Sequence, residues 1–532
     1  MYRNSRLGIL LPTLLALAMS AGILIGIYAV RPSGGASGDV VPKKLRATLS
    51  LIEKAYVDSV DMDSVAERLI PQLVEELDPH SMYIPARELQ SVNESLDGEF
   101  DGIGVMFNMI TDTVVVLNVI SGGPSDRAGV VNGDRIIFID DSLVAGRHID
   151  QNNIVKRLRG KRGTNVSLRI ERGAVRDLVP ITVTRGVVTV KSIDAALMIT
   201  PRIGYVKLLT FSKNSYSEMV KAIDKLREEG MRQLIFDLRG NSGGFLDQAI
   251  SIANELLPGR NLIVYTVDRH KKRTMEYSNG RGKLTDIPLV ILIDEGSASS
   301  SEILAGAIQD NDRGVIIGRR SFGKGLVQQQ FPYSDGSALR LTIARYYTPT
   351  GRSIQKPYDK GNEQYGNDIL NRYKHNEFFS ADSIRFADSL RFVTPGGKVV
   401  YGGGGIMPDI FVPMDTSAIT KYYLEVAGRN ILYRYTLEYS DRHRRQLNAI
   451  RSVDQLRGFI YSDRGLLEEF VSYAARGGVK PVPEQIKAST GLILSQIRSL
   501  VARNSPLEDT GYWAIAFADD QVILRAIEEL DK

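Results

Sequence analysis

The spacing of apolar positions changes along the chain, and each pattern predicts a different kind of domain. Over residues 43–95 apolar side chains recur with the period of an amphipathic helix. Short alternating runs separated by turn residues follow over 96–187 and predict a small β-rich module. Over 188–415 apolar strands alternate with helices, which predicts an α/β domain, and 416–532 has the pattern of amphipathic helices. We therefore expect a multidomain α/β protein with a helical C-terminal region.

A long uncharged segment precedes these domains. Residues 7–30 carry no charge, and a helix of this length can cross a bilayer core of about 30 Å. A cleaved signal peptide is the alternative, since it needs an apolar region of only about 7–15 residues. Because the apolar run continues past the small residues that would accommodate cleavage, we favour an uncleaved single-pass inner-membrane anchor over 1–33. A Gly/Ser-rich linker at 34–42 would join it to a periplasmic bulk of the chain.

Composition excludes several kinds of site. The chain has 532 residues and no cysteine, so disulfides, thiolate metal sites and cysteine nucleophiles are excluded. The net charge of +5 is small for this length, and we expect no nucleic-acid partner. The sequence supplies neither a cluster of metal ligands nor a phosphate-binding loop. We expect no metal and no other cofactor.

A run of serines lies where an apolar strand turns into a helix. Residues 296–328 read GSASSSEILAGAIQDNDRGVIIGRRSFGKGLVQ. Ser299 stands three residues before Glu302, the spacing of a helix capping box, and capping alone would account for such a serine. A strand–turn–helix junction also exposes a hydroxyl and offers backbone N–H groups to an oxyanion. Ser299 is therefore a candidate nucleophile.

A serine nucleophile needs a base, and lysine is the better candidate here. None of the five histidines falls where a core strand ends in a loop, which disfavours a Ser-His-Asp triad. Lys324 lies between two glycines, and a desolvated lysine can accept a proton at neutral pH. Gln328 shares its face of an extended segment and would orient the amine. Ser242 in GNSGG lacks a partner histidine, and Ser353, which precedes Lys356 by three positions, follows a strand instead of opening a helix.

The β-rich module carries its own recognition signal. FDGIGV at 100–105 and GGPSDRAGVVNGDRIIFID at 122–140 together resemble a PDZ domain. In such a loop, glycines expose successive backbone N–H groups that capture a C-terminal carboxylate while the peptide adds a strand to the sheet edge. The candidate peptide-binding residues are Gly102, Ile103, Gly104 and Val105.

Further segments occur in a characteristic order around the serines: LDPHSMY (77–83), GYVKLLTF (204–211), DLRGNSGG (237–244) and GGGGIMPDIFVP (402–413, with a preceding tyrosine). Together with the serine–lysine region they resemble the C-terminal processing (tail-specific) serine proteases over about residues 45–415. The resemblance implies a crotonase-like core with Ser299 as nucleophile, Lys324 as base and Gln328 as its support. It also implies an oxyanion hole built from backbone N–H groups of Gly243 or Gly244 and of Ser300. Ser300 stands where the family usually has alanine, and its hydroxyl would be a decoy.

The resemblance predicts a periplasmic endopeptidase that cleaves polypeptides near their C-termini, held to the membrane by its N-terminal helix. A homodimer and an adaptor protein are further partners to test. A catalytically inactive PDZ scaffold is the main alternative, and a Ser/Lys hydrolase of small esters or cell-wall peptides is another. The joint presence of Ser299, Lys324 and Gln328 favours an active enzyme. A carboxylate-binding module favours polypeptides over small substrates.

Overall fold

The computed structural model describes residues 43–110, 112–173 and 177–532. The expected membrane anchor and its linker lie outside these ranges. Within them, no helix is both long and apolar enough to span a bilayer. The chain divides into two units at Leu73/Val74. The first contains α2 (Lys43–Ala55) and most of α3 (Met62–Glu75), and α2 buries no residue.

The core of the second unit is a six-stranded sheet in the order β10-β11-β12-β15-β16-β21. β10 pairs antiparallel with β11, and the other neighbours are parallel. The strands are β10 (Ile193–Met198), β11 (Ile203–Leu208), β12 (Gln233–Asp237), β15 (Leu289–Ile293), β16 (Val315–Gly318) and β21 (Ile410–Phe411). Every residue of β11, β12 and β15 is buried, as expected for strands covered on both faces.

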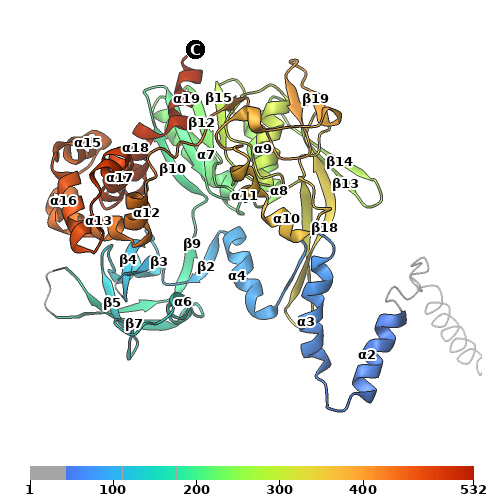
Figure 1. Cartoon of the computed structure of the whole chain (residues 1–532), viewed down its shortest axis with the longest axis horizontal. Helices are drawn as coiled ribbons and strands as arrows, with labels where there is room; N and C mark the ends of the chain where they lie inside the picture. Colours follow the sequence, from blue (N-terminus) through green and yellow to red (C-terminus); the bar gives the residue numbers. More distant parts are fainter. Residues whose placement is uncertain (1–42, 111, 174–176) are drawn as a thin grey trace, which may run out of the picture. The chain divides into compact units, whose positions relative to one another are not determined.

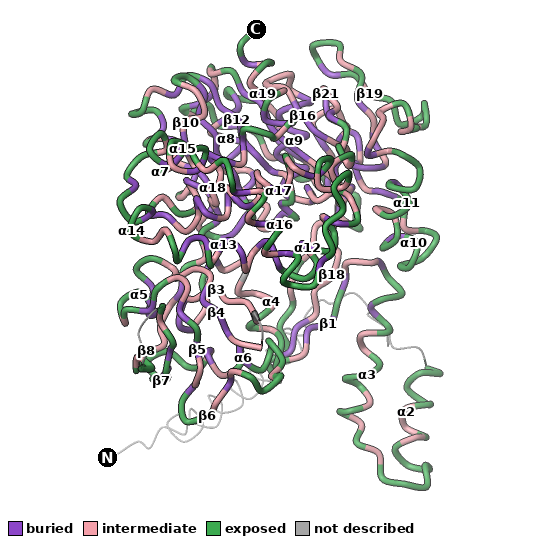
Figure 2. Tube along the Cα trace, turned by 60° about the vertical axis from the view of Figure 1, so that its left-hand side comes forward, coloured by how far each residue is buried: buried purple, intermediate pink, exposed green. Residues whose placement is uncertain are grey.

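Alternate residues of these strands contribute to two separate apolar layers, because successive side chains point to opposite faces of a sheet. Leu234 and Phe236 pack with α7 (Ser215–Glu228), α8 (Leu246–Leu256) and α9 (Ser300–Asp310). Ile235 faces the other way and packs with α19 (Gln521–Leu530). In Figure 2 the purple, buried positions gather on this sheet and on α8 and α9, whereas α2 is largely exposed.

The second unit contains a second, antiparallel sheet, two strands of which, β17 and β18, follow α9 in the sequence. Its order is β1-β18-β13-β14, with β17 also paired to β18, and its pairs are antiparallel. The strands are β1 (Met82–Ile84), β13 (Leu262–Asp268), β14 (Arg273–Tyr277), β17 (Leu326–Pro332) and β18 (Ala338–Tyr347). The helical pattern over 43–95 did not predict β1, which lies in this sheet between α3 and α4 (Ala86–Asp97). Residues 362–401 contain α10 (Asn362–Gly366), α11 (Asp368–Lys374), β19 (Arg391–Val393) and β20 (Val399–Tyr401).

The β-rich module has its own apolar core and a sheet in the order β3-β4-β5-β7-β8, with β6 paired to β5. Its elements are β2 (Glu99–Gly102), β3 (Val105–Ile110), β4 (Thr113–Val119), α5 (Pro124–Ala128), β5 (Arg135–Ile139), β6 (Ser142–Leu143), α6 (Gln151–Leu158), β7 (Asn165–Glu171), β8 (Val179–Thr184) and β9 (Gly186–Thr189). β2 and β9 pair with each other (Figure 1).

The C-terminal region is helical, and α12 to α17 enclose an apolar core of their own. The helices, red and orange in Figure 1, are α12 (Lys421–Gly428), α13 (Ile431–Arg442), α14 (Arg444–Leu447), α15 (Val453–Ser462), α16 (Leu466–Arg476), α17 (Pro483–Arg503), α18 (Glu508–Ala516) and α19. α18 belongs partly to this core, through Ile515, whereas α19 leaves it. Ala514 of α18 and Ile523 of α19 belong to the apolar layer on the six-stranded sheet.

Candidate active site

Ser299 occupies the sharp turn between β15 and α9. Its φ of 53° and ψ of −113° lie in a region that costs energy for a residue with a side chain, and such strain is common at functional turns. The Glu302 carboxylate accepts the Ser299 N–H at 2.9 Å, as the expected capping box requires.

Lys324 lies just before β17, and its amine is held by a side chain from the same hairpin. The Nζ donates to Gln328 Oε1 at 3.1 Å, and Gln328 Nε2 donates to the His80 carbonyl oxygen. Burial lowers the pKa of Lys324, and the nearby charge of Arg340 lowers it further. Both effects increase the fraction of free amine at neutral pH, which is the form that accepts a proton.

Glu302 links the segment of the serine to that of the lysine. Its buried carboxylate accepts the Ser321 hydroxyl at 2.5 Å and the Gly323 N–H at 2.7 Å. It also accepts the Lys324 N–H at 2.8 Å, in addition to the Ser299 N–H. Burial raises the pKa of Glu302 to about 7, and these hydrogen bonds oppose the shift. From the sequence, only a capping role was expected for Glu302.

Tyr346 and His80 also support this arrangement, and the sequence analysis assigned neither a role. The Tyr346 hydroxyl lies 3.1 Å from the Ser299 carbonyl oxygen and donates to that of Lys324. His80 approaches the base through its backbone, and its ring contacts the Tyr365 hydroxyl at 2.7 Å. Burial and the charge of Lys324 lower the pKa of His80 to about 4, so the imidazole is neutral at pH 7. The LDPHSMY segment, which contributed to the family resemblance, was the signal in the sequence that could have identified His80 as a residue near the site.

The loop that follows β12, residues 238–244, packs directly against Ser299 and is called the glycine loop below. A Cβ at Gly243 would lie 2.8 Å from Ser299 Cβ, and the φ of Gly243 is +104°, so only glycine fits without strain. The Gly243 N–H donates to Asn241 Oδ1 at 2.9 Å. Of the two glycines expected to contribute to an oxyanion hole, Gly244 is therefore the better donor. Ser300 is the first residue of α9, where backbone N–H groups have no acceptor within the helix.

The Ser300 hydroxyl has a partner within the site. It donates to the Gly244 carbonyl oxygen at 2.8 Å and so joins the start of α9 to the glycine loop. The sequence did not predict this contact because the loop that supplies the acceptor lies far away along the chain.

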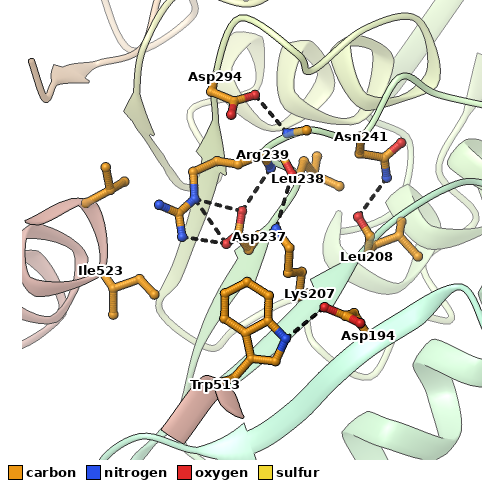
Figure 3. Close-up of polar contacts among 12 residues, drawn as sticks. Asp194, Lys207, Leu208, Asp237, Leu238, Arg239, Asn241, Asp294, Trp513 and Ile523 are labelled. Atoms are coloured by element: carbon orange, nitrogen blue, oxygen red, sulfur yellow. Dashed lines mark hydrogen bonds and ion pairs between the residues drawn. The ribbon is translucent and has the colours of Figure 1, made fainter. Parts of the chain in front are cut away.

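A buried ion network holds the glycine loop from the side of the sheet (Figure 3). Burial alone would raise the pKa of Asp237, but the charges of Arg239 and Lys207 hold it at about 2. Lys207 Nζ donates to the Arg239 carbonyl oxygen at 3.1 Å, and Arg239 forms an ion pair with Asp520 at 2.9 Å. Asn241 Nδ2 donates to the Leu208 carbonyl oxygen at 2.9 Å. Trp513 of α18, which donates to an aspartate on β10, lies beside this network in the same view.

One cleft of about 1,090 Å³ brings the expected catalytic residues together. Its lining includes Ser299, Ser300, Lys324, Gln328, Gly243 and Gly244. Ser242 also lines it. Ser353 does not, and its partner in the alternative site, Lys356, forms an ion pair with Asp368 at 3.0 Å. The geometry favours Ser299 and Lys324 over the Ser353 alternative.

The expected carboxylate loop lies between β2 and β3. Gly102 ends β2, the Ile103 carbonyl oxygen accepts the Ser125 N–H at 2.8 Å, and Gly104 has a φ of +75°. Val105 begins β3, which is an edge strand in the order of its sheet. An edge strand presents unpaired backbone groups, which is what strand addition by a peptide requires.

Comparison with known proteins adds to this geometry. Residues 202–361 match the family model described as peptidase family S41, residues 102–183 that of the PDZ domain, and residues 422–505 a family of unknown function (DUF8443). The chain is 38% identical over 309 residues to a carboxy-terminal-processing protease of Bartonella bacilliformis, covering 57% of this chain and 70% of the relative. It is 30% identical over 350 residues to the carboxy-terminal processing protease CtpA of Bacillus subtilis, covering 65% and 74%. A solved structure of a photosystem II D1 C-terminal processing protease is 25% identical, with a TM-score of 0.37 and coverage of 70% of this chain and 87% of that one.

Proposed function

The chain belongs to the carboxy-terminal processing serine proteases of peptidase family S41, and we propose that it cleaves polypeptides with Ser299 as nucleophile and Lys324 as general base. The observation that carries the proposal is the placement of the Lys324 amine. It is half-buried, it is held by Gln328 at 3.1 Å, and it lines the same cleft as Ser299.

The reaction is an acyl transfer in two steps. Neutral Lys324 accepts the Ser299 hydroxyl proton as the Ser299 oxygen attacks the scissile carbonyl carbon. The N–H groups of Gly244 and Ser300 stabilise the negative charge on the carbonyl oxygen. The ammonium of Lys324 then protonates the leaving amine, which leaves an acyl-enzyme. Lys324 next takes a proton from water as the water oxygen attacks the acyl carbon. Its ammonium then returns a proton to the departing Ser299 oxygen, which releases the acyl group as a carboxylic acid and restores the serine.

We further propose that the PDZ domain selects the substrate by its C-terminus. The Gly102–Val105 loop would bind the terminal carboxylate while the chain end pairs with β3. The apolar segment at 7–30 supports a single-pass anchor in the inner membrane and a periplasmic protease domain. A homodimer and an adaptor protein remain partners to be tested.

The test is digestion of one unstable reporter that ends in either an apolar or a doubly charged tail. The full-length protein in detergent is compared with Ser299→Ala, Lys324→Ala and Ser353→Ala. We expect cleavage of the apolar-tailed reporter alone, a loss of at least about 100-fold in kcat for the first two variants, and normal cleavage for the third.

Two results would contradict the proposal. Cleavage retained in Ser299→Ala would assign the nucleophile elsewhere. Absence of cleavage together with failure of Ser299 to react with an acylating probe would favour the inactive PDZ scaffold. A probe that labels wild type and not Ser299→Ala would instead identify a competent serine in an enzyme that awaits activation.

A further inference from the structure

Arg340 on β18 lines the catalytic cleft, and no carboxylate in the described part of the chain pairs with this cation. Its Nη2 donates to Asn93 Oδ1 at 3.2 Å and to Gln330 Oε1 at 2.9 Å, and both acceptors are neutral amides. Across residues 43–110, 112–173 and 177–532, no carboxylate forms an ion pair with it. Arg340 is half-buried, whereas the fully buried Arg352 of the same domain forms an ion pair with Asp310 at 2.6 Å.

The other cations of the cleft already have roles. In the described part of the chain, three cationic side chains line it: Lys213, Lys324 and Arg340. Lys213 forms an ion pair with Asp97, and Lys324 is the proposed base. A guanidinium that is partly removed from water gains strongly from an anion, and its planar fork matches the two oxygens of a carboxylate. Burial lowers the pKa of Arg340, as expected for a charge whose lost hydration is not replaced.

The strand register gives the position of this cation relative to the reacting centre. In the β17–β18 hairpin Gln328 is paired with Thr342 and Gln330 with Arg340. Arg340 therefore lies one strand repeat, about 7 Å, further along the hairpin than the glutamine that holds the base. An extended substrate advances by about 3.3 Å per residue, so an anion at Arg340 would belong to a residue about two or three positions from the scissile bond.

We propose that Arg340 forms a subsite that binds a carboxylate of the bound polypeptide two or three residues from the cleaved bond. This inference rests on the proposed function, because Ser299 and Lys324 define the reacting centre. The carboxylate has two sources with the same chemistry. It is either an acidic side chain within the substrate or the free C-terminus of a short leaving segment.

The experiment measures kcat/KM for matched peptides with full-length protein in detergent. One series carries Glu or Gln at each of the three positions on either side of the cleaved bond, and the other carries a C-terminal acid or amide. We expect a preference for the acid of about 10- to 100-fold at one position, the range of a charge-assisted hydrogen bond. Arg340→Gln should reduce this ratio to about twofold or less. Which series shows the preference identifies the source of the carboxylate.

Two variants separate recognition from a structural role. Arg345→Gln removes the same charge from an exposed residue of the same strand that contacts the Tyr358 hydroxyl at 3.0 Å, and it should keep the full preference. Arg340→Lys keeps the charge and should keep a reduced preference at the same position. Because the ratio compares two substrates at one pH, any effect of Arg340 on the pKa of Lys324 cancels.

The inference is overturned if wild type shows no preference for acid in either series, or if Arg340→Gln lowers both members of a pair equally. Failure of the proposed function gives a different result, because Ser299→Ala would then retain cleavage whatever the ratio. Binding of fluorescent acid and neutral peptides to Ser299→Ala, with and without Arg340→Gln, checks the subsite independently of turnover.

Discussion

Replacing Glu302 with glutamine should change how the stability of the peptidase core depends on pH. The carboxylate is fully buried and accepts hydrogen bonds from two segments of the site, the turn at Ser299 and the loop at 321–324. Burial raises its pKa from 4.5 to about 7, so the folded protein binds this proton more tightly than the unfolded chain does.

The sign and size of the effect follow from proton linkage. Below pH 4.5 the carboxyl group is protonated in both states, and its stabilising contribution is fully present. As pH rises from 4.5 to about 7 the unfolded state loses the proton first, and the free energy of unfolding falls by about 3 kcal/mol at 1.36 kcal/mol per pKa unit. Above that range no further loss occurs. Glutamine does not titrate, so the wild type should lose about 3 kcal/mol relative to Glu302→Gln across this interval.

The single tryptophan provides the assay. Trp513 packs between α18 and the six-stranded sheet, where its indole N–H donates to Asp194 at 2.7 Å. Its fluorescence should report unfolding of the peptidase core in urea. The free energy of unfolding of the wild type and of Glu302→Gln is measured by urea titration at several pH values between 4.5 and 8.5. Ser321→Ala, which removes a hydrogen bond to the carboxylate, should move the wild-type transition to higher pH. A wild-type-to-variant difference that stays constant within about 0.5 kcal/mol would refute the reasoning.

Two further predictions concern the glycine loop. Asp520→Asn removes the charge that pairs with Arg239 at 2.9 Å, and we expect kcat to fall about three- to tenfold with KM little changed, because the loop loses an anchor and not a substrate contact. An unchanged kcat in steady-state cleavage would exclude this coupling. Gly243→Ala places a Cβ 2.8 Å from Ser299 Cβ at a φ of +104°, and we expect kcat to fall at least about 100-fold while the Trp513 fluorescence of the folded protein is retained. Activity within twofold of wild type would show that the loop is free to move away.

Local patterns predicted the elements that carry the chemistry. The apolar run before Ser299 and the helical spacing after it predicted a strand, a turn and a helix, and the structure has β15 and α9 there. Extended spacing also put Lys324 and Gln328 on one face, and their side chains are in contact at 3.1 Å. These features depend on residues close in sequence, where periodicity and turn chemistry are strong signals. Family resemblance supplied the roles, which composition and spacing alone left open.

The features that sequence reasoning missed depend on long-range contacts. Three residues, Met82–Ile84, are too few to show a strand period, and they pair with β18, more than 250 positions away. The Ser300 hydroxyl has a defined acceptor only because Gly244, 56 positions earlier, returns beside α9. Arg239 and Asp520 are 281 positions apart. No local pattern distinguishes a surface aspartate at the start of a helix from one that pairs with a buried arginine.

The ion pair between Arg239 and Asp520 has a consequence for where the peptidase ends. The family model covers residues 202–361, yet the apolar face of the sheet that includes Ile235 is covered by α19, which lies outside both that match and the helical match at 422–505. Asp520 caps α19 by accepting the N–H groups of Val522 and Ile523, so one carboxylate both starts the helix and pairs with the residue that precedes the glycine loop. A chain that stopped after α17 would expose the face of the sheet and leave Arg239 with Asp237 alone. The catalytic unit therefore includes α19. The helices α12 to α17, which have an apolar core of their own, lie in the sequence between β21 and this part of the unit.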